Sequence, residues 1–171
     1  MSELLIRDAR SSDADAIREV TLAAYHEYAN QMSEIFWDAY RWNILATLAE
    51  VEGVEQLVAE DGGTVVGTTL LYPPRRVTVS DELSLDNPWP EVRLLAVAPT
   101  ARGRGIGLAL MQECVGRARQ SGAPALSLHT TAFMVAAAHM YEQMGFVAAP
   151  QLDFEPAPGF TVKGYRLDLK R

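Results

Sequence analysis

The sequence predicts an α/β (α+β) fold in which a central mixed, mostly antiparallel sheet of six to seven strands is flanked by about four helices. Three observations predict it. Apolar periodicity changes along the chain in the order β-α-α-β-β-β-α-β-α-β-β. The triplet Asp61-Gly62-Gly63 separates two strand-like segments and is a strong hairpin signal. A β-α-β unit between Glu91 and Thr130 then requires parallel neighbours, with helices on both faces of the sheet.

The composition is typical of one globular domain, which we expect to span residues 1–171. The chain has 171 residues, of which 49% are hydrophobic and 22% charged, enough to form a substantial core. Its net charge of −7 argues against a nucleic-acid partner, because phosphate binding requires an excess of Lys and Arg. The single cysteine, Cys114, excludes an internal disulfide and a cysteine-rich metal site, and no metal is expected.

Nothing in the sequence predicts insertion into a membrane or export. No apolar run reaches the roughly 18 residues that are needed to span a bilayer. The first residues, MSELLIRDARSSD, lack the basic and apolar regions of a secretory signal. We therefore expect a cytoplasmic protein with no membrane partner.

The first half of the chain predicts a short strand, two helices and a hairpin. Ser12 or Asp13 is suited to cap the first helix. Gly67 interrupts the last of these strands, which indicates a bulge or a close backbone approach. The expected strands are 4–6, 56–60 and 64–72, and the expected helical stripes are Ile17, Val20, Ala24 and Tyr28, then Phe36, Tyr40, Ile44 and Leu48.

The second half predicts two more helices between strands, after an irregular segment. Residues 73–90 have no clear period and contain four prolines, which is typical of a functional lid or of local disorder. Gly122 is expected to end the first of these helices in a left-handed conformation. The expected strands are 91–98, 125–130, 146–149 and 160–169, and the helices are 105–120, with Ile106, Leu110, Met111, Cys114 and Ala118 inside, and 133–144, with Ala137, Met140, Tyr141 and Met144 in line.

The segment RGRGIG, residues 102–107, joins a strand to a helix and carries three glycines and two arginines. One interpretation is a tight turn with two solvated arginines. The other is an anion site, because backbone N–H groups and the positive end of the helix dipole meet at such a turn. The spacing is neither the G-x-G-x-x-G dinucleotide pattern nor a P-loop. It therefore does not favour a nucleotide-binding oxidoreductase.

Two motifs resemble the GNAT superfamily of N-acetyltransferases. LAVAPTARGRGIGLALM is similar to the family's acyl-CoA segment, Arg/Gln-x-x-Gly-x-Gly/Ala, through Arg102, Gly105 and Gly107. AAAHMYEQMGF is similar to A-x-x-(L/M)-Y-E-x-x-G-F, in which the matching residues are Ala137, Met140, Tyr141, Gly145 and Phe146. The resemblance covers nearly the whole chain and implies a GNAT-type sheet that splays between its fourth and fifth strands.

The resemblance implies acetyl-CoA (coenzyme A) as the cofactor, held mainly by main-chain groups. The pantetheine amides would pair with the strand backbone at Leu95, Ala96 and Val97, where one N–H would also be the oxyanion donor. The pyrophosphate would lie on the backbone of Arg102, Gly103, Arg104, Gly105, Ile106, Gly107 and Leu108.

The resemblance also indicates two catalytic side chains. Glu91, at the start of its strand, is the expected general base, directly or through water, and the alternatives are a solvated glutamate or an ordered water as base. Tyr141 is expected to protonate the departing thiolate, and the alternative is an aromatic side chain packed in the core. Met134 stands where many members have a cofactor-contacting Asn, so we expect no binding role for it.

The sequence contains further histidine, cysteine and aromatic side chains for which we expect other roles. His129 is expected to be hydrogen-bonded in a structural role, and it is the second candidate for the base. His26 and His139 are expected to make local surface contacts, and Cys114 is expected to behave as a small core residue. Candidates for the walls of an acceptor site are Tyr25, Tyr28, Phe36, Trp37, Tyr40 and Trp89. The alternative, ordinary core packing, is expected for most of them.

The sequence thus predicts an acetyl-CoA-dependent N-acetyltransferase, an acyltransferase that acts on a primary amine of a small molecule or peptide by direct attack in a ternary complex. A homodimer is left open. The alternative is a non-catalytic acyl-CoA sensor or interaction domain on the same fold. Tyr141 and Glu91 together favour the enzyme, because a sensor needs only the pyrophosphate loop.

Overall fold

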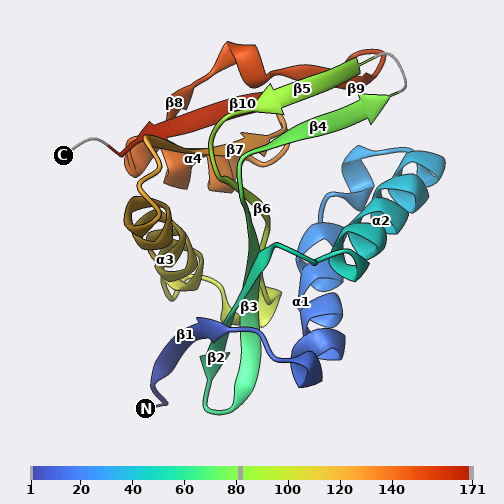
Figure 1. The fold of residues 1–171 in the computed structure, drawn as a ribbon. Helices are drawn as coiled ribbons and strands as arrows, with labels where there is room; N and C mark the ends of the chain where they lie inside the picture. Colours follow the sequence, from blue (N-terminus) through green and yellow to red (C-terminus); the bar gives the residue numbers. More distant parts are fainter. Residues whose placement is uncertain (1, 81–82, 170–171) are drawn as a thin grey trace. The chain divides into compact units, whose positions relative to one another are not determined.

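The computed structural model describes residues 2–80 and 83–169 (Figure 1). The chain divides into two compact units that are interleaved in sequence. The first unit comprises Met1–Leu71 and Leu94–Glu113, and the second comprises Tyr72–Arg93 and Cys114–Arg171. That the whole chain behaves as one domain stays a prediction.

The first unit contains three N-terminal strands, two helices, the end of one shared strand and the start of one shared helix. Its strands follow the order β1-β2-β3-β6, and α1 and α2 pack against each other (Figure 1). The strands β1 and β2, and β2 and β3, pair antiparallel. The elements are β1 (Leu4–Asp8), α1 (Ala14–His26), α2 (Glu34–Ala49), β2 (Glu55–Asp61), β3 (Thr64–Tyr72), β6 (Glu91–Val97) and α3 (Ile106–Gln120), with 3-10 turns at Ser11–Asp13, Ala29–Gln31 and Pro99–Ala101.

Gly67 shows how this unit packs tightly where its helix meets the sheet. The register of β2 and β3 shifts beside it, between Ala59 and Glu60. A Cβ atom on Gly67 would lie 2.9 Å from Cγ2 of Ile106 and 3.3 Å from the carbonyl oxygen of Ala96. The close approach and the bulge that the sequence predicts are therefore both present. Glycine at this position lets α3 pack directly on β3.

The second unit is built on the start of β6. Its strands follow the order β6-β7-β10-β8, with β9 also paired to β10, and a separate hairpin consists of β4 and β5 (Figure 1). Strands β6 and β7 pair in parallel, through Glu91 with Ser127 and Val92 with Leu128. The elements are β4 (Arg75–Ser80), β5 (Leu83–Asn87), β7 (Ala125–Thr130), α4 (Val135–Gln143), β8 (Val147–Ala148), β9 (Phe154–Ala157) and β10 (Phe160–Asp168), with a 3-10 turn at Pro150–Leu152.

The buried residues of the helices agree in part with the periodicity of the sequence. In α1, Ile17, Val20 and Ala24 are buried, and in α2 only Ile44 of the expected stripe is fully buried. Tyr141 is the buried residue of α4. All five residues expected inside α3 are buried, namely Ile106, Leu110, Met111, Cys114 and Ala118. The expected stripe is therefore confirmed in full for α3. In α2 and α4 one member of each expected stripe is buried, and Tyr28 lies beyond the end of α1.

Two local expectations are wrong. The segment 73–90 is not irregular, because it contains the antiparallel hairpin of β4 and β5, although residues 81–82 lie outside the described part of the chain. Asp13 precedes α1 but makes no side-chain cap. Its carboxylate instead accepts hydrogen bonds from the Arg10 backbone at 2.7 Å and from Arg7 at 2.8 Å. The Asp13 carboxylate is therefore engaged by donors from outside α1.

The sheet class is confirmed for the residues that the structure describes: the main sheet is mixed, mostly antiparallel and open, and it is accompanied by four α-helices. It contains eight strands where six to seven were expected. Among the residues that the structure describes, no helix is long and apolar enough to cross a membrane.

Candidate active site

The loop from β6 to α3 has the geometry that the sequence predicts for an anion site. Gly103 and Gly105 adopt left-handed conformations with φ of +75° and +76°. A Cβ atom on either glycine would meet no atom within 4 Å, so the backbone here borders open space. The N–H of Ala109 donates to the carbonyl of Gly105 at 3.0 Å, which places the start of α3 directly after the loop.

The first turn of α3 presents backbone donors at this loop. N–H groups of the first helical turn have no carbonyl partner within the helix, and the helix dipole makes them attractive to an anion. Ile106, Gly107 and Leu108 are the first three residues of α3, and the residues 102–105 precede them. A pyrophosphate fits this donor set and the open space at the two glycines.

Both loop arginines are ion-paired, which the sequence did not predict. The Arg102 guanidinium pairs with Glu27, just beyond α1, and also donates to the Ala24 carbonyl at 3.3 Å. Nη1 of Arg104 lies 2.8 Å from Oδ2 of Asp61, at the end of β2. Hydrogen bonds from Ser2 and then Arg104 lower the pKa of Asp61. The arginines thus hold the loop to α1 and β2, and their charge is partly neutralised.

The backbone of β6 has one strained residue next to the expected pantetheine strand. Leu94 has φ of 51°, in the left-handed region that leucine rarely adopts. Such strain persists only where surrounding structure imposes it, and it concentrates at functional sites. Leu95, Ala96 and Val97 follow directly in β6, and the Ala98 N–H donates to the Val66 carbonyl at 2.8 Å.

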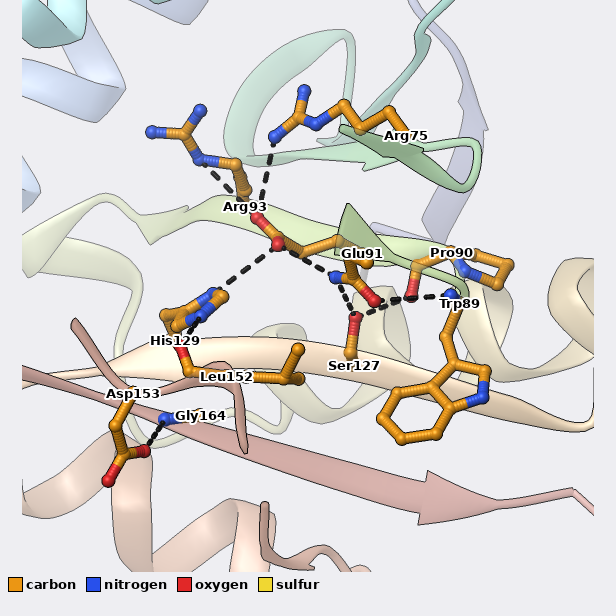
Figure 2. A network of polar contacts seen from close by, with 11 residues as sticks. Arg75, Trp89, Pro90, Glu91, Arg93, Ser127, His129, Leu152, Asp153 and Gly164 are labelled. Atoms are coloured by element: carbon orange, nitrogen blue, oxygen red, sulfur yellow. Dashed lines mark hydrogen bonds and ion pairs between the residues drawn. The ribbon is translucent and has the colours of Figure 1, made fainter. Parts of the chain in front are cut away.

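Glu91 lies at the centre of a buried polar cluster in the second unit (Figure 2). Its Oε2 accepts a hydrogen bond from Asn87 at 3.1 Å and lies 3.3 Å from Nδ1 of His129. Its Oε1 lies 3.6 Å from Nη2 of Arg75 and 3.7 Å from Nε of Arg93. Figure 2 shows the two arginines reaching the carboxylate from one side and His129 from the other.

Asn87 and Ser127 hold the start of β6 in place. The Asn87 amide donates to Oγ of Ser127 at 2.8 Å, and that hydroxyl donates to the Pro90 carbonyl at 2.9 Å (Figure 2). The side-chain oxygen of Asn87, Oδ1, accepts a hydrogen bond from the backbone N–H of Trp89 at 3.1 Å. The side chains of Asn87 and Ser127 are both buried. Their hydrogen bonds therefore fix the position of the Glu91 carboxylate.

Glu91 is a charged group kept ionised inside the protein. Burial acts to raise its pKa, but the hydrogen bond from His129 and the charges of Arg93 and Arg75 outweigh burial, so the pKa is lowered. His129 is held at both ring nitrogens, because its Nε2 lies 2.8 Å from the Leu152 carbonyl oxygen. The hydrogen bonding expected for His129 is therefore present, and its role stays a prediction.

Tyr141 is buried in the second unit. Its ring packs on Phe146, with centroids 5.8 Å apart. This is the core packing that the sequence allowed, and a buried ring with a polar tip remains compatible with a proton-donating role. Cys114 is fully buried, as expected of a small core residue.

The remaining expected residues make local contacts. His139 lies 3.1 Å from the amide of Gln143, and the His26 ring meets Trp37 edge to face at 5.5 Å. A pocket of about 710 Å³ between α1 and α2 includes Trp37, the one aromatic acceptor candidate among its lining residues. Those residues are Leu22, Ala23, His26, Trp37, Asp38 and Arg41.

Comparison with known proteins identifies the family of the chain. The model of the acetyltransferase (GNAT) family matches residues 15–146. An uncharacterized N-acetyltransferase, YhfO of Bacillus subtilis (strain 168), is 33% identical over 141 residues, or 82% of this chain and 88% of the relative. The L-amino acid N-acetyltransferase AaaT of Escherichia coli (strain K12) is 32% identical over 67% of this chain and 64% of its own.

A solved structure shares the fold. A GNAT family acetyltransferase from Brucella melitensis, in complex with acetyl-CoA, superposes with a TM-score of 0.58 at 25% identity, covering 99% of this chain and 90% of that one. The chain belongs to the GNAT acetyltransferase family and is an acyltransferase.

Proposed function

We propose that the protein transfers an acetyl group from acetyl-CoA to a primary amine of a small molecule or peptide, by direct attack in a ternary complex. The observation that carries the proposal is the β6–α3 loop. It combines two left-handed glycines, open space beside them and the first turn of α3 in one backbone cradle. That cradle suits the pyrophosphate of coenzyme A.

The cofactor supplies an activated acetyl thioester, and the chain supplies binding and proton transfer. In the proposal, the backbone from Arg102 to Leu108 holds the pyrophosphate. The backbone of Leu95, Ala96 and Val97 pairs with the pantetheine amides, and one of its N–H groups stabilises negative charge on the carbonyl oxygen.

Glu91 is the proposed base, acting directly or through water, because its lowered pKa keeps it ionised at neutral pH. Attack requires an uncharged amine, so the ammonium form must first lose a proton to a group of this kind. Tyr141 is the proposed acid for the departing thiolate. The proton that leaves the amine is thereby balanced by one that the thiolate gains.

The rival function is a sensor that binds acyl-CoA without turnover. A thiol-release assay on a panel of amines separates the two. The proposal predicts release that depends on the amine and falls in Tyr141→Phe. Coenzyme A binding without amine-dependent release on any amine, in wild type and variant alike, supports the sensor instead.

A further inference from the structure

We infer that the face of α2 opposite Ile44 is the interface of a homodimer, in which the α2 helices of two copies pack antiparallel to each other. The inference concerns how the chain assembles, so it goes beyond the proposed function and does not depend on it. All the residues that carry it belong to the first unit.

The helix α2 is apolar on two opposite sides. Ile44 is its buried residue. Ile35 and Trp42 are large and apolar, yet they are 84% and 70% exposed. They are seven residues apart, about two helical turns, so they lie on the same side of the helix. Ile44 follows Trp42 by two residues, a rotation of about 200°, and therefore lies on the other side.

Small residues complete an apolar seam on the exposed side. Ala39 and Ala49 are exposed and Ala46 is half-buried. Together with Ile35 and Trp42 they recur at intervals of four, three, four and three residues. This spacing is typical of a helix that packs along another helix. Scattered apolar residues are common on protein surfaces, but a row of this length on one side of a helix indicates a contact surface.

A row of charged residues follows one edge of this seam. Glu34, Asp38 and Arg41 are all exposed, and each precedes a seam residue by one position. They are the charged residues of α2, with the acids in the first two turns and the base in the third. In a dimer with a two-fold axis each surface meets its own copy, so this edge of one helix lies beside the same edge of the other.

One register satisfies the apolar and the charged residues together. Ile35 of each copy lies opposite Trp42 of the other, so that both large side chains are covered. Arg41 then lies midway between Glu34 and Asp38 of the second copy, and the symmetry repeats this arrangement. A parallel pair would instead place the charged row beside the uncharged edge of the other helix. Charge complementarity therefore favours a second copy, in the antiparallel orientation, as the occupant of this face.

The contact is of the size of a weak interface. The charged row borders the pocket of about 710 Å³ between α1 and α2, because Asp38 and Arg41 line it together with Leu22 and Ala23 of α1. A second copy that covers the row therefore also covers apolar surface of α1. The two helices overlap over about ten residues, or 15 Å, which is less than a standard interface requires. We therefore expect a dissociation constant of about 1–100 µM.

Sedimentation velocity of the full chain between about 1 and 500 µM tests the assembly. We expect a shift from monomer to dimer over this range. Ile35→Ser and Trp42→Ser should each raise the dissociation constant at least about tenfold. Both side chains are mostly exposed, so the melting temperature at low protein concentration should change little. Val135→Ser is the matched control and should leave the dissociation constant unchanged, because Val135 of α4 is 71% exposed and lies outside the seam.

Exchange of charges tests the register. Arg41→Glu makes the charged row entirely acidic, and the double variant Glu34→Lys, Asp38→Lys makes it entirely basic. Each variant alone should remain monomeric over the same concentration range because like charges then face each other. An equimolar mixture of the two should form a heterodimer. Dimers of either variant alone, or a mixture that stays monomeric, would contradict the register.

Cross-linking tests the orientation of the helices. Ala39→Cys lies beside the two-fold axis, within disulfide reach of its copy, so mild oxidation should give a covalent dimer. Ala49→Cys should not cross-link, because the two copies of that residue are about 30 Å apart in this register. The natural Cys114 is buried. Cross-linking of both variants would indicate parallel helices. A wild-type protein that is monomeric up to about 500 µM, or an equal effect of Val135→Ser and Trp42→Ser, would overturn the inference and leave the proposed function intact.

Discussion

Nδ1 of His129 lies 3.3 Å from Oε2 of Glu91, while Nε2 of the same ring lies 2.8 Å from the Leu152 carbonyl oxygen. Both ring nitrogens of His129 therefore face a neighbouring oxygen atom, which holds the ring in one orientation against the Glu91 carboxylate. The histidine is therefore better suited to position Glu91 than to replace it as the base.

Glu91→Gln removes the charge of the proposed base while keeping the side chain's shape. We expect kcat to fall about 10²-fold, the lower range for loss of a general base. Because the pKa of Glu91 is lowered, the wild-type carboxylate stays ionised through neutral pH, so the loss should be similar between about pH 6 and 9. Steady-state kinetics across this range measures it, with the exposed Glu142→Gln on α4 as control. An unchanged kcat would mean that the base is an ordered water or another residue.

Tyr141→Phe removes one hydroxyl and keeps the ring that packs on Phe146. We expect kcat to fall about 10²-fold, because the thiolate would leave without a positioned proton donor. Coenzyme A affinity and the melting temperature should change little. The check is single-turnover kinetics together with calorimetric binding. A normal rate in this variant would show that Tyr141 serves only as core packing.

Gly105→Val tests the pyrophosphate cradle. A branched side chain at φ of +76° is strained, and its methyl groups would enter the open space beside the loop. We expect coenzyme A binding to weaken by more than about tenfold, or 1.4 kcal/mol. Gly53→Val is a matched control, because Gly53 has φ of +73° and equally open surroundings away from the loop.

Both glycine variants should lose similar stability from backbone strain, about 1–3 kcal/mol. Only Gly105→Val should lose coenzyme A affinity in titration calorimetry. If the two variants bind coenzyme A alike, the loop is not the pyrophosphate site.

Asp13→Asn tests the contribution of the hydrogen bonds that Arg7 and the Arg10 backbone donate to the Asp13 carboxylate. Hydrogen bonds from Arg7 and then from the Arg10 backbone lower the pKa of Asp13 from 3.8 to about 2. A depressed carboxylate pKa stabilises the fold above the unfolded value and loses this contribution as pH falls through about 2. We expect the variant to lose about 1–2 kcal/mol at pH 7, allowing for partial screening by water.

Urea unfolding of wild type and Asp13→Asn as a function of pH measures this contribution. The difference between the two proteins should be constant at neutral pH and should shrink between about pH 4 and 2. A difference that does not depend on pH would show that lost packing, rather than charge, accounts for the change.

Short-range patterns in the sequence predicted most of the fold. The buried face of α3, the β2–β3 hairpin and the close approach at Gly67 each follow from spacing within a few residues. The β4–β5 hairpin was missed because four prolines dominate residues 73–90. The alternation of Val77, Val79, Leu83 and Leu85 with polar residues was a signal that would have found it.

In the candidate site, the sequence predicted the backbone conformation of the glycine loop but not the contacts between side chains. Positive φ at Gly103 and Gly105 is expected of glycine, but φ of 51° at Leu94 has no signal in its side chain. The partners of the loop arginines, Glu27 and Asp61, are distant in sequence and were not foreseen. The approach of Arg75 and Arg93 to Glu91 likewise joins residues that periodicity does not bring together.

The most direct test of the account is to follow the acetyl group itself. The purified protein is incubated with acetyl-CoA labelled with ¹³C in both acetyl carbons and with a mixture of amino acids and amines, and the products are examined by mass spectrometry. The account predicts an amine that gains the doubly labelled acetyl group, in an amount equal to the coenzyme A released. Coenzyme A release without any labelled amine, or no release at all, would contradict it.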